Sequence, residues 1–141
     1  MLKGIDPILN GALLGALQDM GHGDVLALVD RNYPAVSTSN RLVSLSGADV
    51  GQAARAILSV FPVDTFVEPA AFRMGEVGNE DAVLDVHAEF QSIIDQAEGR
   101  TVAVQPLERF EFYRRAGDAF LTVATSEDRP YGCFLLVKGV V

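Results

Sequence analysis

The stretch Val25-Leu26-Ala27-Leu28-Val29, followed by Asp30, decides the fold class of this 141-residue chain. Five consecutive apolar residues are typical of a strand that is covered on both faces. Strands of this kind belong to sheets with helices on each side, because an apolar face must pack against another element. The stretch therefore predicts an α/β fold with a central strand over residues 25–29.

Outward from this strand, helical and strand patterns alternate along the chain. Further strands are expected over residues 41–45, 65–74, 101–104, 120–125 and 133–137, with loops over 31–40 and 126–132. Helices are expected from Asp6 or Asn10 to about Gly21, and over 49–61, 79–97 and 109–116, with Asp49 as a cap. The alternation predicts a single three-layer αβα domain over residues 1–141, with a mostly parallel central sheet.

Composition excludes several classes of function. The net charge of −8 leaves no broad basic surface for nucleic acid. Cys133 is the only cysteine, which excludes an intramolecular disulfide and a multi-cysteine zinc site. No apolar run approaches the roughly 20 residues that span a membrane, and the N-terminus lacks the layout of a secretory signal. We therefore expect a cytoplasmic protein without a membrane or nucleic-acid partner.

His22 lies between Gly21 and Gly23, directly before the central strand. The glycines allow a sharp helix-to-strand transition, and imidazole can accept and donate protons near neutral pH. From these residues alone, a water-exposed loop histidine is the simpler interpretation, and proton transfer is the alternative. Metal binding is not expected, because only His22 and Asp24 are available locally.

Candidate binding residues occur at three other places. Asp30 follows the central strand, at the edge where open α/β sheets place ligands, although it can equally cap the next turn. Arg109 can donate several hydrogen bonds, and Phe110, Phe112 and Tyr113 beside it offer an apolar face or core packing. Tyr131, Gly132 and Cys133 form either a ligand contact or a plain strand-entry turn. A nucleophilic Cys133 is the less favoured alternative to inert packing.

Several motifs along the whole chain resemble the fucose-mutarotase and ribose-pyranase family. They are Leu2-Lys3-Gly4-Ile5, Met20-Gly-His-Gly-Asp24, Asp30, Arg109-Phe-Glu-Phe-Tyr-Arg-Arg-Ala116, Tyr131-Gly132 and Lys138-Gly139-Val140. The Gly-His-Gly-Asp and Arg-Phe-x-Phe-Tyr segments look closer to the fucose branch. One departure is Cys133, which stands where the family usually has an asparagine, and a thiol is a much weaker hydrogen-bonding group than an amide.

The resemblance implies an isomerase that interconverts the anomers of a sugar, with L-fucose as the favoured substrate and no cofactor. It implies His22 as the catalytic residue and a ring-like homo-oligomer with sites near subunit boundaries. The sugar contacts that it implies are Asp30, Arg109, Tyr131, Gly132 and Cys133. Two alternatives stay open: a D-ribose pyranase, and a noncatalytic sugar-binding regulatory module.

Overall fold

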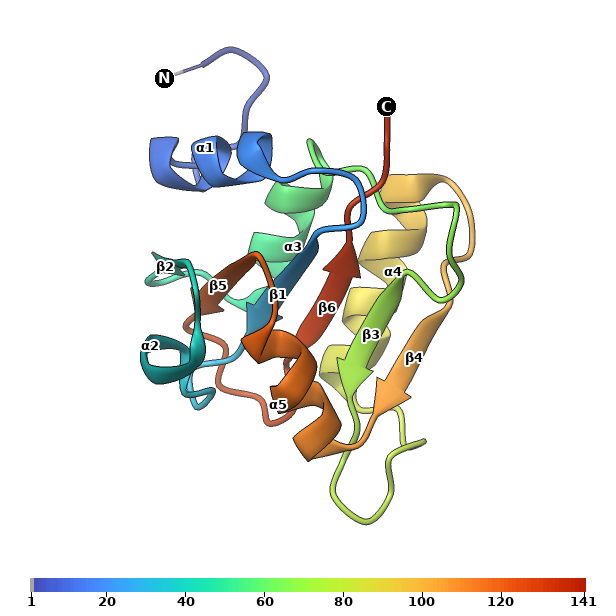
Figure 1. Cartoon of the computed structure of the whole chain (residues 1–141). Coiled ribbons are helices and arrows are strands. Elements are labelled where there is room, and N and C mark those ends of the chain that lie inside the picture. The colour runs from blue at the N-terminus through green and yellow to red at the C-terminus, as the bar shows by residue number, and fades with distance from the viewer. Residues whose placement is uncertain (1) are drawn as a thin grey trace.

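The computed structural model describes residues 2–141, which form a six-stranded sheet with helices on both faces (Figure 1). The strands are β1 (Val25–Val29), β2 (Leu42–Leu45), β3 (Ala71–Met74), β4 (Val104–Leu107), β5 (Leu121–Thr125) and β6 (Phe134–Val137). The helices are α1 (Gly11–Asp19), α2 (Ala35–Thr38), α3 (Val50–Leu58), α4 (Asp85–Glu98) and α5 (Arg109–Gly117). Helices α3 and α4 cover one face and α5 covers the other (Figure 1), so the predicted three-layer α/β fold is confirmed.

The order of the strands places the residues that follow β1 beside those that precede β6. The order is β2-β5-β1-β6-β3-β4, and β6 runs antiparallel to β1 and β3 while the other neighbouring pairs are parallel. The sheet is therefore mostly parallel, as predicted. Because Leu28 pairs with Phe134, the carboxyl end of β1 and the start of β6 lie side by side, at the same end of these two central strands. Asp30 and Cys133 consequently meet there, although they are far apart in sequence.

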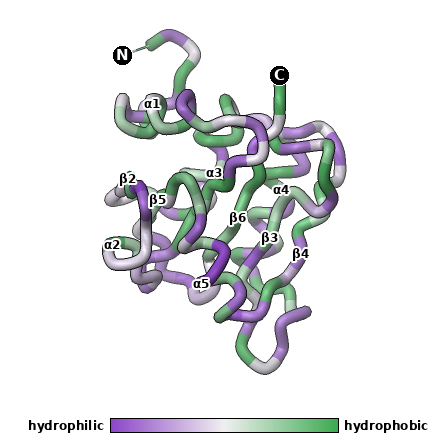
Figure 2. Tube along the Cα trace, viewed as in Figure 1, coloured by the Kyte–Doolittle hydropathy of each residue, from purple (hydrophilic) through white to green (hydrophobic). Residues whose placement is uncertain are grey.

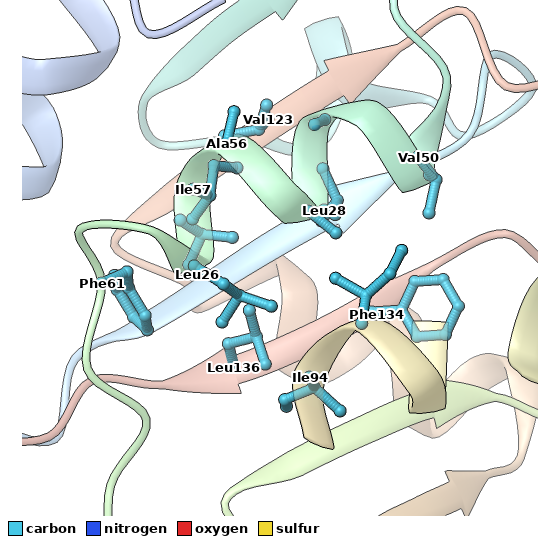
Figure 3. Packing of buried hydrophobic residues seen from close by; sticks show 14 of the residues in the cluster. Leu26, Leu28, Val50, Ala56, Ile57, Phe61, Ile94, Val123, Phe134 and Leu136 are labelled. Atoms are coloured by element: carbon cyan, nitrogen blue, oxygen red, sulfur yellow. The ribbon is translucent and has the colours of Figure 1, made fainter. Parts of the chain in front are cut away.

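The two central strands are buried on both faces, as the apolar run predicts. Leu26 and Leu28 belong to the core beneath α3 and α4, whereas Ala27 and Val29 face the smaller core beneath α5. Figure 3 shows Leu26 and Leu28 packed among other residues of the larger core, the one beneath α3 and α4. In Figure 2 the hydropathy colouring shows that β6 is apolar. Burying one such aliphatic side chain contributes about 1.5–3 kcal/mol to the stability of the fold. The two central strands are therefore held firmly in place, and so are the residues at their ends.

Side-chain caps decide where two helices begin. Asn10 accepts a hydrogen bond from the Leu13 N–H at 2.9 Å and starts α1, whereas Asp6 forms a separate turn before it. Of the two predicted starts, Asn10 is confirmed and Asp6 is wrong. Asp49 and Gln52 form a capping box at α3, which confirms the cap predicted there. Helix α3 ends at Leu58, three residues before the expected position.

Three predicted boundaries, those of α4, β3 and β4, are wrong. Helix α4 begins at Asp85 rather than near residue 79, because Arg73 binds the carbonyl oxygens of Glu80 and Asp81. Strand β3 covers only Ala71–Met74 of the expected 65–74, and β4 begins where 101–104 was expected to end. Pro106 is accommodated within β4 because this strand lies at the edge of the sheet.

The expected loop over residues 31–40 contains the short helix α2. Within residues 2–141, none of the helices is long and apolar enough to cross a lipid bilayer.

Candidate functional site

A cavity of 190 Å³ lies at the edge of the sheet where β1 ends and β6 begins. It is lined by Asp30, Asn32, Tyr33, Met74, Arg109, Tyr113, Pro130, Tyr131 and Cys133. The fold thus brings together Asp30, Arg109, Tyr131 and Cys133, four of the residues expected to contact a sugar. This volume is below the roughly 300–1,000 Å³ of pockets that hold drug-sized ligands, so the cavity suits a small molecule rather than a dinucleotide.

Asp30 is buried, with 6% of its surface exposed, and it shapes the turn that forms one wall of the cavity. Its Oδ1 atom accepts hydrogen bonds from the N–H groups of Asn32 at 2.9 Å and Tyr33 at 3.0 Å. The turn-capping interpretation of Asp30 is therefore confirmed. Its Oδ2 atom takes part in neither of these bonds, so Asp30 can cap the turn and still accept a hydrogen bond from a ligand.

Arg109 is the first residue of α5, and its position is fixed by the helix start. The Glu108 carboxylate accepts hydrogen bonds from the N–H groups of Phe110 and Glu111. The Nε atom of Arg109 is buried and has no hydrogen-bond partner among residues 2–141. Buried N–H groups are nearly always paired, so this one is a donor suited to a ligand oxygen.

The aromatic residues of the α5 segment divide between the core and the cavity. Phe112 is fully buried, Phe110 is 65% exposed outside the cavity, and Tyr113 lines the cavity. The Tyr113 ring lies 5.5 Å from that of Tyr33, which also lines the cavity and which no sequence pattern indicated. Burial raises the pKa of the Tyr33 phenol, so this group stays protonated and can donate a hydrogen bond.

Tyr131 has an unusual backbone and a side chain that lines the cavity. Its φ angle of 62° is the only positive value among the non-glycine residues at positions 2–141. Its hydroxyl oxygen accepts a hydrogen bond from the Val77 N–H at 3.4 Å. Gly132, in contrast, is buried and does not line the cavity. A Cβ atom on Gly132 would lie 2.9 Å from Glu127 Cγ, so glycine is required for packing there.

Cys133 lies deep in the cavity wall with 1% of its surface exposed. Its Sγ atom accepts a hydrogen bond from the Asp30 N–H at 3.5 Å. Burial, reinforced by the nearby Asp30 carboxylate, raises the pKa of the thiol well above its usual value. Cys133 therefore stays neutral, which suits packing and not nucleophilic attack.

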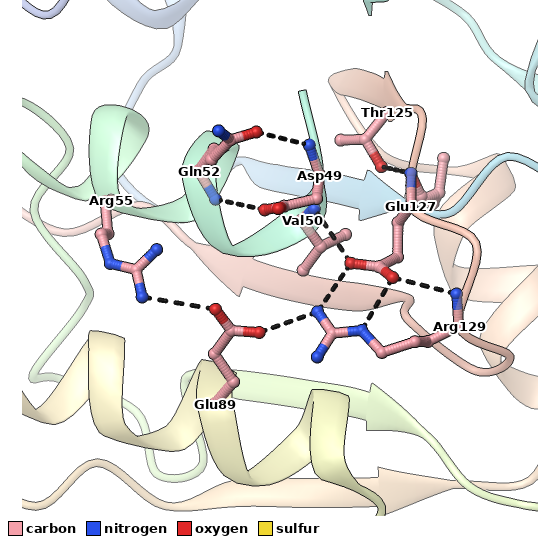
Figure 4. Close-up of polar contacts among 9 residues, drawn as sticks. Asp49, Val50, Gln52, Arg55, Glu89, Thr125, Glu127 and Arg129 are labelled. Carbon is pink, nitrogen blue, oxygen red and sulfur yellow. Dashed lines mark hydrogen bonds and ion pairs between the residues drawn. The ribbon is translucent and has the colours of Figure 1, made fainter. Parts of the chain in front are cut away.

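An ion pair between the buried Glu127 and the partly exposed Arg129 holds the connection that carries Tyr131 (Figure 4). The Glu127 carboxylate accepts hydrogen bonds from the Arg129 guanidinium at 2.8 Å and from the Val50 N–H at 3.3 Å. Arg129 also donates to Glu89 of α4 at 2.7 Å. The bonds from Arg129 lower the pKa of Glu127 to about 2, so this carboxylate is ionised at neutral pH. Helices α3 and α4 thereby fix the segment between β5 and β6.

His22 lies at the opposite end of β1 and does not line this cavity. It borders a separate hollow of 490 Å³, together with Met20, Lys138 and Val140. The five residues of β1 separate the two positions, which corresponds to about 16 Å at about 3.3 Å per residue. Within one chain, His22 therefore cannot touch a molecule that is held by Asp30 and Arg109.

His22 is paired with Asp64, a residue that no sequence pattern indicated. Its Nε2 atom lies 3.1 Å from Asp64 Oδ1, and its side chain is 45% exposed. Burial would raise the pKa of Asp64, but hydrogen bonds from the Phe66 N–H and from His22 outweigh this effect and lower it. Because the carboxylate is an acceptor, Nε2 of His22 carries the proton of this hydrogen bond.

Comparison with known proteins identifies the family. Residues 3–141 match the model of the RbsD / FucU transport protein family. The chain belongs to this family. It is 40% identical over 146 residues to the fucose mutarotase of Homo sapiens, covering 99% of this chain and 94% of that protein. It is 35% identical over 140 residues to the L-fucose mutarotase of Haemophilus influenzae (strain 86-028NP), covering 99% and 97%.

A solved structure of an RbsD / FucU relative supports the same grouping. The crystal structure of the fucose mutarotase in complex with L-fucose from Streptococcus pneumoniae has a TM-score of 0.89 with this chain, at 32% identity over 99% of both chains. The family resemblance expected from the sequence is thus confirmed. In this member of the family, the expected binding residues and the expected catalytic histidine lie at opposite ends of one strand.

Proposed function

We propose that this member of the RbsD / FucU family is an L-fucose mutarotase, which interconverts the α and β anomers of the sugar. The observation that carries the proposal is the convergence of Asp30, Arg109 and Tyr131 on one small cavity. The similarity to named fucose mutarotases extends over nearly the full length of the chain. Residues 1–141 then act as one mutarotase domain.

Each opening or closing of the sugar ring needs two proton transfers and no change in oxidation state. A base removes the proton from the anomeric hydroxyl, the C1–O1 bond becomes a carbonyl, and the bond from C1 to the ring oxygen breaks with its electron pair passing to that oxygen. An acid protonates the ring oxygen, the aldehyde group rotates, and the same steps in reverse close the ring. Positioned acid–base groups typically accelerate such transfers about 10²–10⁴-fold.

Asp30, Arg109 and Tyr131 are suited to holding the sugar while the ring opens. The Oδ2 atom of Asp30 can accept from a sugar hydroxyl, and the unpaired Nε–H of Arg109 can donate to one. Tyr113 and Tyr33 add aromatic surface that suits the apolar methyl group of a deoxy-sugar. The buried thiol of Cys133 supplies bulk and at most a weak hydrogen bond.

We further propose that His22 acts on a sugar bound by a neighbouring copy of the chain. His22 is separated from the Asp30 cavity by the length of β1, but its side chain is 45% exposed and imidazole can both accept and donate protons. An exposed apolar residue lies beside it: the Phe66 ring is 5.2 Å from the His22 ring and 71% exposed, and Val67, the next residue in the chain, is 50% exposed. These features support a ring-like homo-oligomer in which one copy presents His22–Asp64 to the cavity of the next.

Saturation-transfer NMR of L-fucose tests the proposed activity directly, because it measures exchange between anomers at equilibrium. We expect the wild-type protein to accelerate L-fucose exchange, and Asp30→Asn to lose most of that acceleration. D-ribose at the same enzyme concentration separates a mutarotase from a pyranase, because faster pyranose–furanose exchange of ribose would favour the latter. Thermal stabilisation by L-fucose with no faster exchange of any sugar would instead identify a binding module.

The cytoplasmic location is also part of the proposal. A reducing compartment suits the free and buried thiol of Cys133. Fractionation of cells that express the protein checks this placement.

A further inference from the structure

The backbone of Tyr131 is hydrogen-bonded to a buried histidine that does not line the cavity. His87 is the third residue of α4 and is 3% exposed. Its Nε2 atom lies 3.1 Å from the carbonyl oxygen of Tyr131. Tyr131 is the residue with the left-handed backbone, a conformation that a side chain with Cβ rarely adopts without support from its surroundings.

The surroundings of His87 determine which ring nitrogen carries the proton. Two donors converge on Nδ1: the Leu84 N–H at 3.2 Å and a guanidinium N–H of Arg73 at 3.3 Å. Nδ1 must therefore accept, which leaves the single proton of the neutral ring on Nε2. Nε2 then donates to the carbonyl of Tyr131. Burial, followed by the charge of Arg73, lowers the pKa of His87 and keeps the ring neutral.

Arg73 ties the same cluster to the loop before α4. It is buried, with 6% exposed, and its guanidinium donates to the carbonyl oxygens of Glu80 and Asp81. That loop includes Val77, whose N–H donates to the hydroxyl of Tyr131. The backbone of Tyr131 is thus held by His87 and its side chain by Val77, and neither of these two residues lines the cavity.

From this arrangement we infer that His87 is a positioning residue for sugar binding: through its Nε2–H it fixes the backbone of Tyr131 and so the place of the Tyr131 ring in the cavity. The inference rests on the proposed function of the cavity. His87 does not line the cavity, and Tyr131 is the cavity residue to which its Nε2–H donates, so its effect passes through Tyr131. A residue of this kind sets the affinity for sugar and leaves the proton-transfer steps unchanged.

Two substitutions separate positioning from simple structural support. In His87→Gln the amide nitrogen can replace Nε2 as donor to Tyr131, whereas in His87→Asn the amide oxygen can replace only Nδ1 as acceptor for Leu84 and Arg73. We expect His87→Asn to raise the KM for L-fucose about five- to tenfold with kcat nearly unchanged, as for the loss of one hydrogen bond. His87→Gln should keep KM within about twofold of wild type.

Gln52→Ala is the matched control, because Gln52 has the same capping role in α3 and makes no contact with Tyr131. It should lower the melting temperature and leave KM unchanged. An unchanged KM in His87→Asn, or a KM that rises equally in His87→Gln, would overturn the inference. If instead Asp30→Asn and Tyr131→Phe exchanged L-fucose as fast as wild type, the proposed function of the cavity would fail first.

Nitrogen-15 NMR of the wild-type protein tests the inference even if the variants do not fold. The expected result is a neutral His87 ring with the proton on Nε2, whose signal shifts when L-fucose saturates the protein. A His22→Gln variant assigns the two histidines. A proton on Nδ1, or a signal that L-fucose leaves unmoved, would contradict the proposed link between His87 and the sugar.

Discussion

Mixing two variants of reduced activity, His22→Ala and Asp30→Asn, tests whether one site takes residues from two copies of the chain. Within one chain, β1 holds these residues about 16 Å apart, at about 3.3 Å for each of its five residues. Proton transfer needs heavy atoms about 3 Å apart, or one intervening water. If both residues serve one reaction, His22 of one copy must therefore meet the cavity of another.

The arrangement of the site determines how much L-fucose exchange activity the mixture of the two variants should regain. We expect His22→Ala alone to lose about 100-fold or more in the rate of L-fucose exchange, and Asp30→Asn at least about tenfold. In an assembly that mixes the two chains at random, about one quarter of the sites combine intact His22 from one variant with intact Asp30 from the other. The mixture should therefore recover about a quarter of the wild-type rate.

The assay is saturation-transfer NMR on assemblies that were co-expressed with two different tags and purified through both. A mixture of His22→Ala with Asp64→Asn is the matched control. Since His22 and Asp64 pair within one chain, no site in that mixture receives an intact pair, and we expect no recovery. The reasoning is refuted if the first mixture assembles but stays inactive, or if the control mixture recovers as well.

Three further predictions concern stability and binding. The pKa of Glu127, about 2 instead of 4.5, means that its ion pair with Arg129 stabilises the fold above pH 4.5 and loses this effect as the pH falls towards 2. Urea titrations should show up to about 3 kcal/mol of such acid-dependent loss in wild type and none of it in Glu127→Gln. A Cβ atom on Gly139 would lie 2.8 Å from a backbone carbon of the neighbouring segment, so Gly139→Ala should destabilise by about 1–3 kcal/mol. The control Gly15→Ala, in open space on α1, should stabilise by up to about 1 kcal/mol, and an equal loss in both variants would refute the packing argument. Arg109→Lys lacks the buried Nε–H and should raise the KM for L-fucose about tenfold, so an unchanged KM would remove Arg109 from the sugar contacts.

Local sequence signals were sufficient where the physical cause is local. The apolar run over residues 25–29 predicted β1 with its bounds, and Asp49 predicted the start of α3, because burial on both faces and N-capping depend on neighbouring residues. The start of α4 could not be predicted in this way. It depends on Arg73, whose guanidinium binds carbonyl oxygens at positions 80 and 81 that would otherwise suit a helix.

In the candidate site, too, some residues could be predicted from local sequence and others could not. The sequence identified Asp30, Arg109 and Tyr131 by residue type and by the strand and helix ends that they occupy. Asp64 and His87 gave no signal, because each acts through one contact with a residue more than 40 positions away, at Asp64–His22 and His87–Tyr131. No periodicity or motif encodes such a pair.

By itself, then, the sequence determined the layers of the fold, the family and the chemical types present at the site. The tertiary structure decided which of these residues can meet. The antiparallel course of β6 brings Cys133 and Tyr131 to Asp30, while the length of β1 keeps His22 away from them. The reason is that side-chain chemistry is a property of single residues, whereas reach is a property of strand order and strand length, which only the packed sheet fixes.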